Sequence, residues 1–285
     1  MKKTLFTALM SLAILALFCG CCKEGGAPTK SSNPAVNQAE STPEAAKAFL
    51  ESGDFTLIVG LDASFPPYGF QNEKGELVGF DLDLAREVAR RQNWKIELRG
   101  IDWDAKDAEL SSGVINCIWN GFTINGRENL YTWSEPYVDS SQVILVRKDS
   151  DIKTKADLAG KVVEAQVDSS GLKAIKDPSS KELLDSLKKL IEVPNFNQAY
   201  MELETGVCDA VIIDYGVAIT LMATDNATRL LDEELVPEKY GVGFKLGNTV
   251  LRDTVQATLD EMHEDGTFTE ISKKWFNGQD VTIRK

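Results

Sequence analysis

Two distant segments of the chain share one local pattern, and this repeat constrains the fold more than any other feature. SSGVINCIWNG (111–121) and ETGVCDAVIID (204–214) each contain the end of a predicted helix, then Gly-Val, then an Asn or Asp, and then an apolar run. The glycine suits a helix end, and the β-branched run suits a buried parallel strand. Each copy therefore predicts one α/β unit. Such junctions occur in any α/β protein, so the repeat alone leaves one lobe and two lobes equally open.

The chain alternates strand and helix patterns from about residue 55 onward, which predicts the α/β class. Strands are predicted at 55–62, 95–100 and 141–150, and helices at 80–93, 104–113, 179–190, 197–206 and 249–266. In such proteins the functional loops follow the carboxyl ends of the parallel strands. Residues 120–127 and Asp214 occupy these places.

Of the five cysteines, Cys117 and Cys208 are the two within this part of the chain, one in each copy of the repeat. If the copies belong to separate lobes, the two residues lie too far apart for a disulfide. We therefore expect two free thiols.

Arg127 is the first candidate binding residue, because it follows the turn dipeptide Asn125-Gly126 and projects from a loop at a strand end. A guanidinium group there can bind a carboxylate through two parallel hydrogen bonds. Alternatively, Arg127 is a surface residue that pairs with Glu128. The groups near Arg127 decide between a binding residue and a surface residue. Thr123 adds a hydroxyl group and Asn120 a backbone carbonyl.

Asp214 ends the apolar run AVIID, where an ionised carboxylate is costly unless it meets a cation such as an ammonium group. DSSG (168–171) offers hydroxyl and backbone N–H groups at a predicted helix start, which suits an anion. Phe65, before Pro66-Pro67 in the loop after the first strand, and Trp103 are candidate aromatic walls, although such rings more often pack in a core. Together these groups predict a site in which one lobe binds a carboxylate and both lobes bind an ammonium group.

Nine motifs follow one another along the chain: GLDASFPPYGF, GFDLDLAREVA, DWD, NGFTINGR, TWSEPY, DLAGKVVEAQVDSS, GVCDAVIID, YGVGFKLGN and DGTFTEISKKWF. Together, over about residues 55–276, they resemble the polar amino-acid-binding proteins that feed bacterial ABC importers. The resemblance implies the type II periplasmic-binding-protein fold, with two α/β lobes joined by a two-strand hinge. Lobe 1 would comprise 55–139 and 241–275, and lobe 2 would comprise 142–237. The lobes would close on a free amino acid and deliver it to a permease.

The resemblance also implies roles for individual residues. Arg127 would bind the α-carboxylate with help from Thr123 and Ser170, whereas Asp214 would bind the α-ammonium with the backbone at Asn120 and Gly121. The other implied pocket residues are Phe65 as the covering ring, Trp103 on the side-chain wall, Gln166 and Ser169 from lobe 2, and Asp62, which in some members reads a polar side chain.

Two departures from the family pattern stand near these residues. The lead Asn125-Gly126 into Arg127 is one residue shorter than in many members. Asp168-Ser169-Ser170 replaces a frequent Gly-Thr-Thr; Asp168 could add a negative charge near the carboxylate end, but we expect it to face solvent.

The N-terminus reads as an export signal, because Lys2 and Lys3 precede an apolar run too short for a permanent membrane span. FCGC resembles the cleavage box of bacterial lipoproteins, which predicts a signal peptide at 1–20 and lipid modification of Cys21. Residues 21–43, rich in Gly, Pro, Ser and Asn, predict a flexible tether. A plain signal peptide with incidental cysteines is the alternative. The protein would then be an extracytoplasmic, lipid-anchored monomer.

The formal net charge of −13 makes nucleic acid or an anionic lipid surface an unsuitable partner. With one histidine, no phosphate-binding glycine loop and no His/Cys cluster, the sequence predicts neither catalysis nor a cofactor or metal. Two alternatives remain open on the same fold: a periplasmic dehydratase of prephenate or arogenate type, and an amino-acid sensor or surface antigen. The side-chain identity of the ligand stays undetermined beyond polar.

Overall fold

Residues 42–283 of the 285 are described by the computed structural model. The predicted signal peptide, the lipidation candidate Cys21 and the tether up to residue 41 lie outside these residues. The last two tether residues begin a helix instead: the Thr42 side chain accepts a hydrogen bond from the Ala45 N–H (3.3 Å) and caps α2 (Pro43–Glu51).

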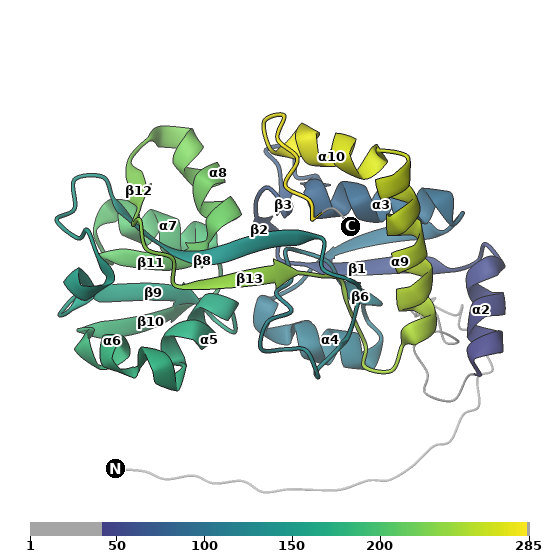
Figure 1. The fold of residues 1–285 in the computed structure, drawn as a ribbon, viewed down its shortest axis with the longest axis horizontal. Helices are drawn as coiled ribbons and strands as arrows, with labels where there is room; N and C mark the ends of the chain where they lie inside the picture. The colour runs from purple at the N-terminus through teal and green to yellow at the C-terminus, as the bar shows by residue number, and fades with distance from the viewer. Residues whose placement is uncertain (1–41, 284–285) are drawn as a thin grey trace, which may run out of the picture. The chain divides into compact units, whose positions relative to one another are not determined.

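Lobe 1 is built on a five-stranded sheet whose order is β5-β1-β6-β14-β7 (Figure 1). Its strands are β5 (Lys95–Gly100), β1 (Thr56–Leu61), β6 (Cys117–Ile118), β14 (Gly243–Phe244) and β7 (Thr132–Trp133). β1 pairs in parallel with β5 and β6, whereas β14 is antiparallel to β6 and β7. A small antiparallel sheet of β2 (Ser64–Phe65), β3 (Gly69–Gln71) and β4 (Leu77–Val78) completes the strands of this lobe.

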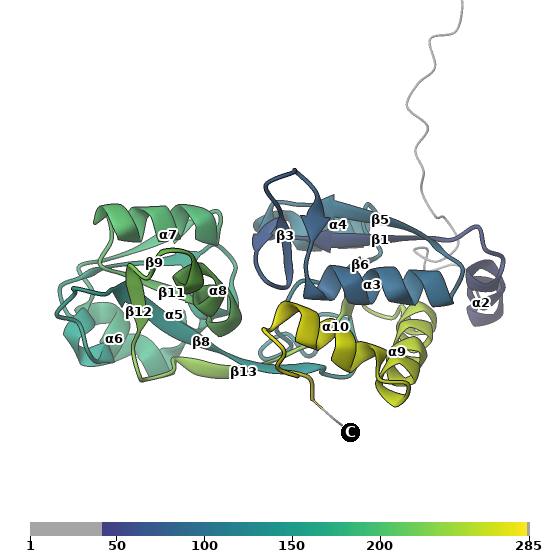
Figure 2. The same cartoon turned by 90° about the horizontal axis from the view of Figure 1, so that it is seen from above.

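Helices cover both faces of the lobe 1 sheet, so its strand β1 is apolar and buried over residues 57–61. Alternate residues of β1 enter different cores: Val59 packs in the same core as Val88 of α3, and Ile58 in the same core as Leu110 of α4. The two figures agree that α3 and α10 lie on the opposite side of β1 from α4 (Figure 2). The helices of the lobe are α3 (Phe80–Arg91), the short η1 (Trp103–Ala105), α4 (Lys106–Ser112), α9 (Thr249–Glu264) and α10 (Thr267–Trp275).

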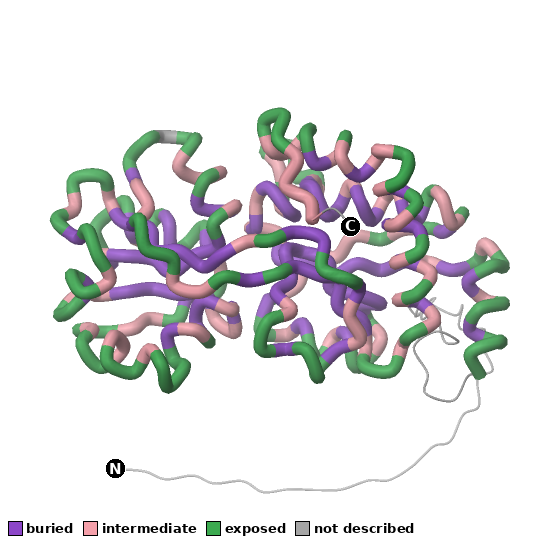
Figure 3. The backbone as a smooth tube through the Cα atoms, viewed as in Figure 1, coloured by how far each residue is buried: buried purple, intermediate pink, exposed green. Residues whose placement is uncertain are grey.

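Lobe 2 is a second α/β unit, in which the sheet order is β10-β9-β11-β8-β12. Its own strands are β10 (Lys189–Val193), β9 (Val162–Gln166), β11 (Ala210–Asp214) and β12 (Thr228–Leu230). Its helices are η2 (Lys155–Leu158), α5 (Ser170–Lys176), η3 (Pro178–Ser180), α6 (Lys181–Ser186), α7 (Phe196–Thr205) and α8 (Tyr215–Asp225). β9 is parallel to both β10 and β11. Figure 3 shows the inner strands of this sheet buried and the outer helical turns exposed, and β9 and β11 are such inner strands, whereas β10 lies at the edge.

Two antiparallel strands connect the lobes. β8 (Val138–Arg147) and β13 (Val236–Tyr240) pair from Tyr240 opposite Val138 to Val236 opposite Gln142. In Figure 1 both strands run from the helices of lobe 1 to those of lobe 2. The predicted fold class, two α/β lobes with a two-strand hinge, is confirmed.

One predicted helix extends too far at its C-terminal end. The pattern at 179–190 predicted a single amphipathic helix, but α6 ends at Ser186 and residues 189–193 form β10. β10 pairs in parallel with β9 along its whole length, and this pairing outweighs the local helical pattern. Both Cys117 and Cys208 are buried free thiols, as expected. Within residues 42–283 no helix is long and apolar enough to cross a membrane.

Candidate functional site

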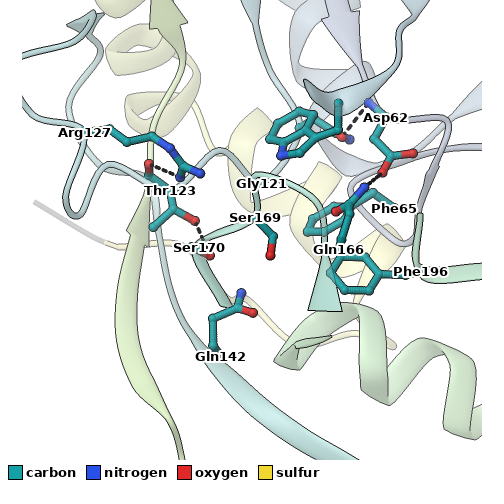
Figure 4. A pocket seen from close by; sticks show the side chains of 12 residues that line it. Asp62, Phe65, Gly121, Thr123, Arg127, Gln142, Gln166, Ser169, Ser170 and Phe196 are labelled. Carbon is teal, nitrogen blue, oxygen red and sulfur yellow. Dashed lines mark hydrogen bonds between the residues drawn. The ribbon is translucent and has the colours of Figure 1, made fainter. Parts of the chain in front are cut away.

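A small cavity of about 20 Å³ lies between the lobes (Figure 4). Its lining residues are Asp62, Phe65, Trp103, Asn120, Gly121, Thr123, Arg127, Gln142, Gln166, Ser169, Ser170 and Phe196. The structure thus brings together all the predicted pocket residues except Asp214. It adds Gln142 from β8 and Phe196 from the start of α7, which the sequence did not single out.

The carboxyl ends of the parallel strands meet at this cavity, which explains why distant residues converge there. Asp62 follows β1, Asn120 lies just after β6, and Gln166 is the last residue of β9. The Asn120 Oδ1 accepts a hydrogen bond from the Asp62 N–H (2.9 Å), and the Gln166 Nε2 donates to the Asp62 Oδ2 (2.6 Å). The second bond joins lobe 2 to lobe 1.

Arg127 is the cation of the cavity, and it is 2 % exposed. Its two terminal nitrogens donate to the backbone oxygens of Thr123 (3.1 Å) and Asp168 (3.0 Å), whereas its Nε has no hydrogen-bond partner in residues 42–283. Burial lowers the pKa of its guanidinium group. A buried cation held by carbonyl groups and with an unused donor is suited to receive an anion.

A second buried cation, Lys106, ties the two lobes together beside Arg127. Lys106 is 1 % exposed, and its ammonium group contacts the Trp103 carbonyl (3.2 Å) and forms an ion pair with Asp168 of lobe 2. Lys173 lies 3.4 Å from the same carboxylate. Burial alone would raise the pKa of Asp168, but Lys106 and the other cations outweigh it and the pKa is lowered. Asp168 therefore pairs across the lobes rather than facing solvent.

Gly121 has a backbone that other residues rarely adopt, with φ of +54°. A Cβ atom there would come within 2.6 Å of the Phe65 ring, so the glycine allows this aromatic wall to approach. The Gly121 N–H donates to the Asp81 carboxylate (2.5 Å), which also accepts from the Tyr137 hydroxyl (2.9 Å). Asp81, fully buried at the start of α3, thus holds the Gly121 backbone in place.

Burial raises the pKa of Asp81 from its ordinary value of 3.8 to about 7, against its two hydrogen bonds. The stability that the protonated carboxyl group contributes is fully present below pH 3.8 and is lost as the pH rises through about 7. In Asp81→Asn the amide oxygen can accept from Gly121 and the amide N–H₂ can donate to the Tyr137 oxygen. From pH 4 to pH 8 we expect this variant to gain on the order of 2–4 kcal/mol over the wild type in urea unfolding.

Asp54→Asn is the matched control, because it removes an exposed carboxyl group before β1. Its stability should follow the wild type at every pH. If Asp81→Asn also follows the wild type across this range, the buried Asp81 does not titrate as argued.

Aromatic rings form one wall of the cavity. The Phe65 ring lies 5.8 Å from that of Phe196, so lobe 1 and lobe 2 each supply one ring. Trp103 packs edge-on against Phe122 at 5.5 Å, which fixes its orientation. The cavity is therefore polar at its Arg127 and Asp62 ends and apolar along this wall.

Asp214 lies outside the cavity lining, although it was predicted as a pocket residue. Its carboxylate caps α8 by accepting from the Gly216 N–H (2.9 Å) and the Val217 N–H (3.2 Å), and it also accepts from the Ser140 hydroxyl (3.1 Å). Burial, and then the neighbouring Glu238, raise the pKa of Asp214 well above its ordinary value. The part of the chain that the structure describes holds no cluster of His, Cys, Asp and Glu suited to a metal ion.

Proteins similar to this chain are named for amino acids. The L-cystine-binding protein TcyJ of Escherichia coli strain K12 is 32 % identical over 234 residues, which cover 80 % of this chain and 84 % of that protein. The glutamine-binding protein GlnH of Bacillus subtilis is 26 % identical over 281 residues, covering 96 % of this chain and 97 % of the relative. None of the relatives named here is described as an enzyme.

A solved structure that resembles this chain also contains a bound amino acid. A substrate-binding protein of a Streptococcus pneumoniae ABC uptake transporter, with bound histidine, matches with a TM-score of 0.76 and 31 % identity over 80 % of this chain and 95 % of that one. The model of the bacterial extracellular solute-binding proteins, family 3, matches residues 57–278. The chain therefore belongs to the bacterial extracellular solute-binding proteins of family 3.

Proposed function

We propose that this protein captures a polar amino acid as a zwitterion between its two lobes and delivers it to the membrane subunits of an ABC importer. The family is extracellular and its members bind solutes rather than catalyse reactions, so the dehydratase alternative is not favoured. The relatives named above bind cystine, glutamine and histidine, which share a free α-carboxylate and α-ammonium group.

Arg127 is the observation on which the proposal rests. It is a buried cation whose Nε–H has no partner within residues 42–283, and it lines a cavity to which both lobes contribute polar groups. The α-carboxylate of the ligand would supply the missing anion. Thr123 and Ser170, from opposite lobes, lie 3.3 Å apart through their hydroxyl oxygens and would help to hold the same group.

The ammonium end of the ligand would lie toward Asp214, with the backbone at Asn120 and Gly121. Glu238 connects Asp214 to the cavity. It interacts with Asp214 and accepts a hydrogen bond from Thr123 (2.7 Å), which lines the cavity.

The ligand side chain would lie at the other end, where Asp62 and Gln166 meet beneath the Phe65 and Phe196 rings. A buried carboxylate and an amide can bind either a cationic or a neutral polar group, so these residues favour a polar side chain without choosing one. Ser169 would add its backbone from lobe 2, and Trp103 would limit the length of the side chain.

The protein would act as an extracytoplasmic monomer. Cys21 would carry the lipid anchor after removal of residues 1–20, and most of the 21–43 segment would give the lobes reach from the membrane. Closure of the lobes on the β8–β13 hinge would form the surface that the permease recognises.

Thermal unfolding of residues 32–285, a segment that contains both lobes, tests the proposal. The protein is unfolded in guanidinium and refolded first, so that any ligand carried through purification is removed. Each of the common amino acids is then added, together with cystine, ornithine and prephenate, and each stabilising compound is titrated by calorimetry. We expect one or a few amino acids to raise the melting temperature with the concentration dependence of a ligand that binds only the folded state.

A rise with prephenate alone would instead support the dehydratase alternative. No rise with any amino acid would overturn the proposed function, provided that the refolded protein unfolds cooperatively.

A further inference from the structure

Glu238 is a buried carboxylate at the point where both lobes meet the hinge. It lies on β13, is 3 % exposed and accepts four hydrogen bonds. Its Oε2 accepts from the hydroxyl groups of Thr123 (2.7 Å) and Ser170 (2.8 Å), and its Oε1 from the Gln142 Nε2 (2.8 Å) and the Tyr240 hydroxyl (3.2 Å). Three of these donors line the cavity, so Glu238 lies directly behind it.

A second buried carboxyl group lies next to Glu238. Ser140 of β8 is paired opposite Glu238 of β13, and its hydroxyl donates to the Asp214 Oδ2 (3.1 Å). Asp214 is fully buried at the end of β11, and its carboxyl group interacts with that of Glu238. The hinge pairing therefore places two acids side by side.

The groups around this pair supply hydrogen bonds but no adjacent cation. The contacts of both acids described above are hydroxyl, amide and backbone N–H groups. Tyr240 faces Glu238, and Tyr68 packs beside Asp214 with a pKa raised well above its ordinary value, first by burial and then by that carboxylate. Arg127 interacts with Glu238 only by charge attraction at a distance, because its terminal nitrogens donate to backbone carbonyls.

Two adjacent buried carboxylates cannot both be charged without a cation, and one of them holds a proton in the empty protein. Burial and Glu238 place that proton on Asp214. The cavity is separated from the pair by the hydroxyl groups of Thr123 and Ser170, which can rotate.

On the basis of the proposed function, we propose that the Asp214–Glu238 pair exchanges its proton for the ligand's ammonium group, so that each amino acid bound releases one proton. The amino acid enters as a zwitterion. Its ammonium N–H groups donate to Glu238 in place of the Thr123 and Ser170 hydroxyl groups, the added positive charge releases the Asp214 proton to solvent, and no covalent bond within the ligand changes. Glu238 becomes a specificity residue, because it selects ligands that carry a free α-amino group.

Isothermal titration of residues 32–285 tests this exchange with the stabilising amino acid itself as the probe. Titrations at about pH 7 in phosphate, imidazole and Tris, which differ in ionisation enthalpy, give the number of protons released from the slope of the observed enthalpy. We expect about one proton for the wild type and none for Asp214→Asn, whose amide cannot titrate. Asp54→Asn, which removes an exposed carboxyl group outside the cavity lining, should bind with wild-type affinity and keep the release.

Glu238→Gln tests selectivity for the amino group. It keeps the shape of the side chain but loses one acceptor oxygen and the charge. We expect about tenfold or greater loss of affinity for the amino acid, and a smaller loss for its α-hydroxy analogue, so the preference between the two ligands falls. A merely structural role would weaken both ligands equally.

The number of protons that the wild type releases on binding tests the exchange by itself, even if the variants fold poorly. Amino-acid binding without proton release would overturn the exchange and leave the proposed function intact. Absence of amino-acid binding would remove both.

Discussion

Replacing Arg127 with alanine is expected to weaken amino-acid binding by roughly 2–5 kcal/mol, the usual cost of leaving a buried charge without its partner. In the variant the ligand's α-carboxylate would enter a buried space without the only cation that lines the described cavity. The variant also loses two hydrogen bonds to backbone carbonyls and the contact of the guanidinium group with the Phe122 ring at 5.2 Å, so its stability is measured beside its affinity; we expect the fold to persist. Calorimetric titration measures the affinity, and urea unfolding measures the stability.

Arg90→Ala is the matched control, since Arg90 lies on the surface of α3, where its side chain is 69 % exposed. Its affinity should equal that of the wild type. Arg127→Lys should recover only part of the binding, because an ammonium group cannot form two parallel bonds with a carboxylate. An Arg127→Ala protein with wild-type affinity would refute the assignment of the carboxylate site.

Gly79→Ala should destabilise the protein by roughly 3–5 kcal/mol, a large share of the stability of an ordinary domain. Gly79 precedes α3 with φ of 145°, a conformation that side chains rarely adopt. A Cβ atom there would lie 2.2 Å from the carbonyl oxygen of Tyr68 and 2.5 Å from its carbon. These are backbone atoms, and the same Tyr68 oxygen accepts from the Asp81 N–H (3.0 Å), so the clash cannot be relieved by a rotamer change.

Gly75→Ala separates backbone conformation from the clash. Gly75 also has positive φ, +79°, but its Cβ would meet nothing closer than the Gln71 Nε2 at 3.7 Å. We expect this control to lose about 1–2 kcal/mol of stability. The free energy of unfolding in urea should be lower for Gly79→Ala than for Gly75→Ala, by the loss that the clash with Tyr68 adds. Equal values would show that the Tyr68 contact is not rigid.

The sequence predicted the lobes and most of the cavity because both depend on local patterns. Strand ends are recognisable where apolar runs stop, and parallel strand ends meet at one edge of a sheet, so residues 120–127 could be placed at such an edge from the pattern alone, whereas Asp62 and Gln166 were expected there only from the family resemblance. Arg127 was recognisable from its turn.

Other features depend on pairing between distant segments, which leaves no local signal. Gln142 precedes the apolar run VILV, and this polar residue in a buried strand was the available sign that β8 borders a polar space. Glu238 stands in VPEKYG, where nothing distinguishes it from the other acids near it. The first two residues of β10 were included in a predicted helix, because the pairing of this strand with β9 leaves no signal in the local sequence.

Asp81 illustrates the same limit. Its position near a helix start was predicted, but its hydrogen bond to Gly121 crosses 40 residues of sequence. A first-turn acid is usually explained by the helix dipole. Its burial and its second bond to Tyr137 identify it as a support of the cavity instead.

The ion pair between Lys106 and Asp168 has a consequence for how affinity and selectivity can change independently. It joins residues of different lobes outside the set that lines the cavity, so it stabilises the shut form whether the cavity is filled or empty. The apparent affinity for a ligand is the affinity of the shut form multiplied by the fraction of empty molecules already shut. Substitutions at this pair therefore change the apparent affinity for every ligand by a common factor. The order of affinities among ligands depends instead on the residues that contact them.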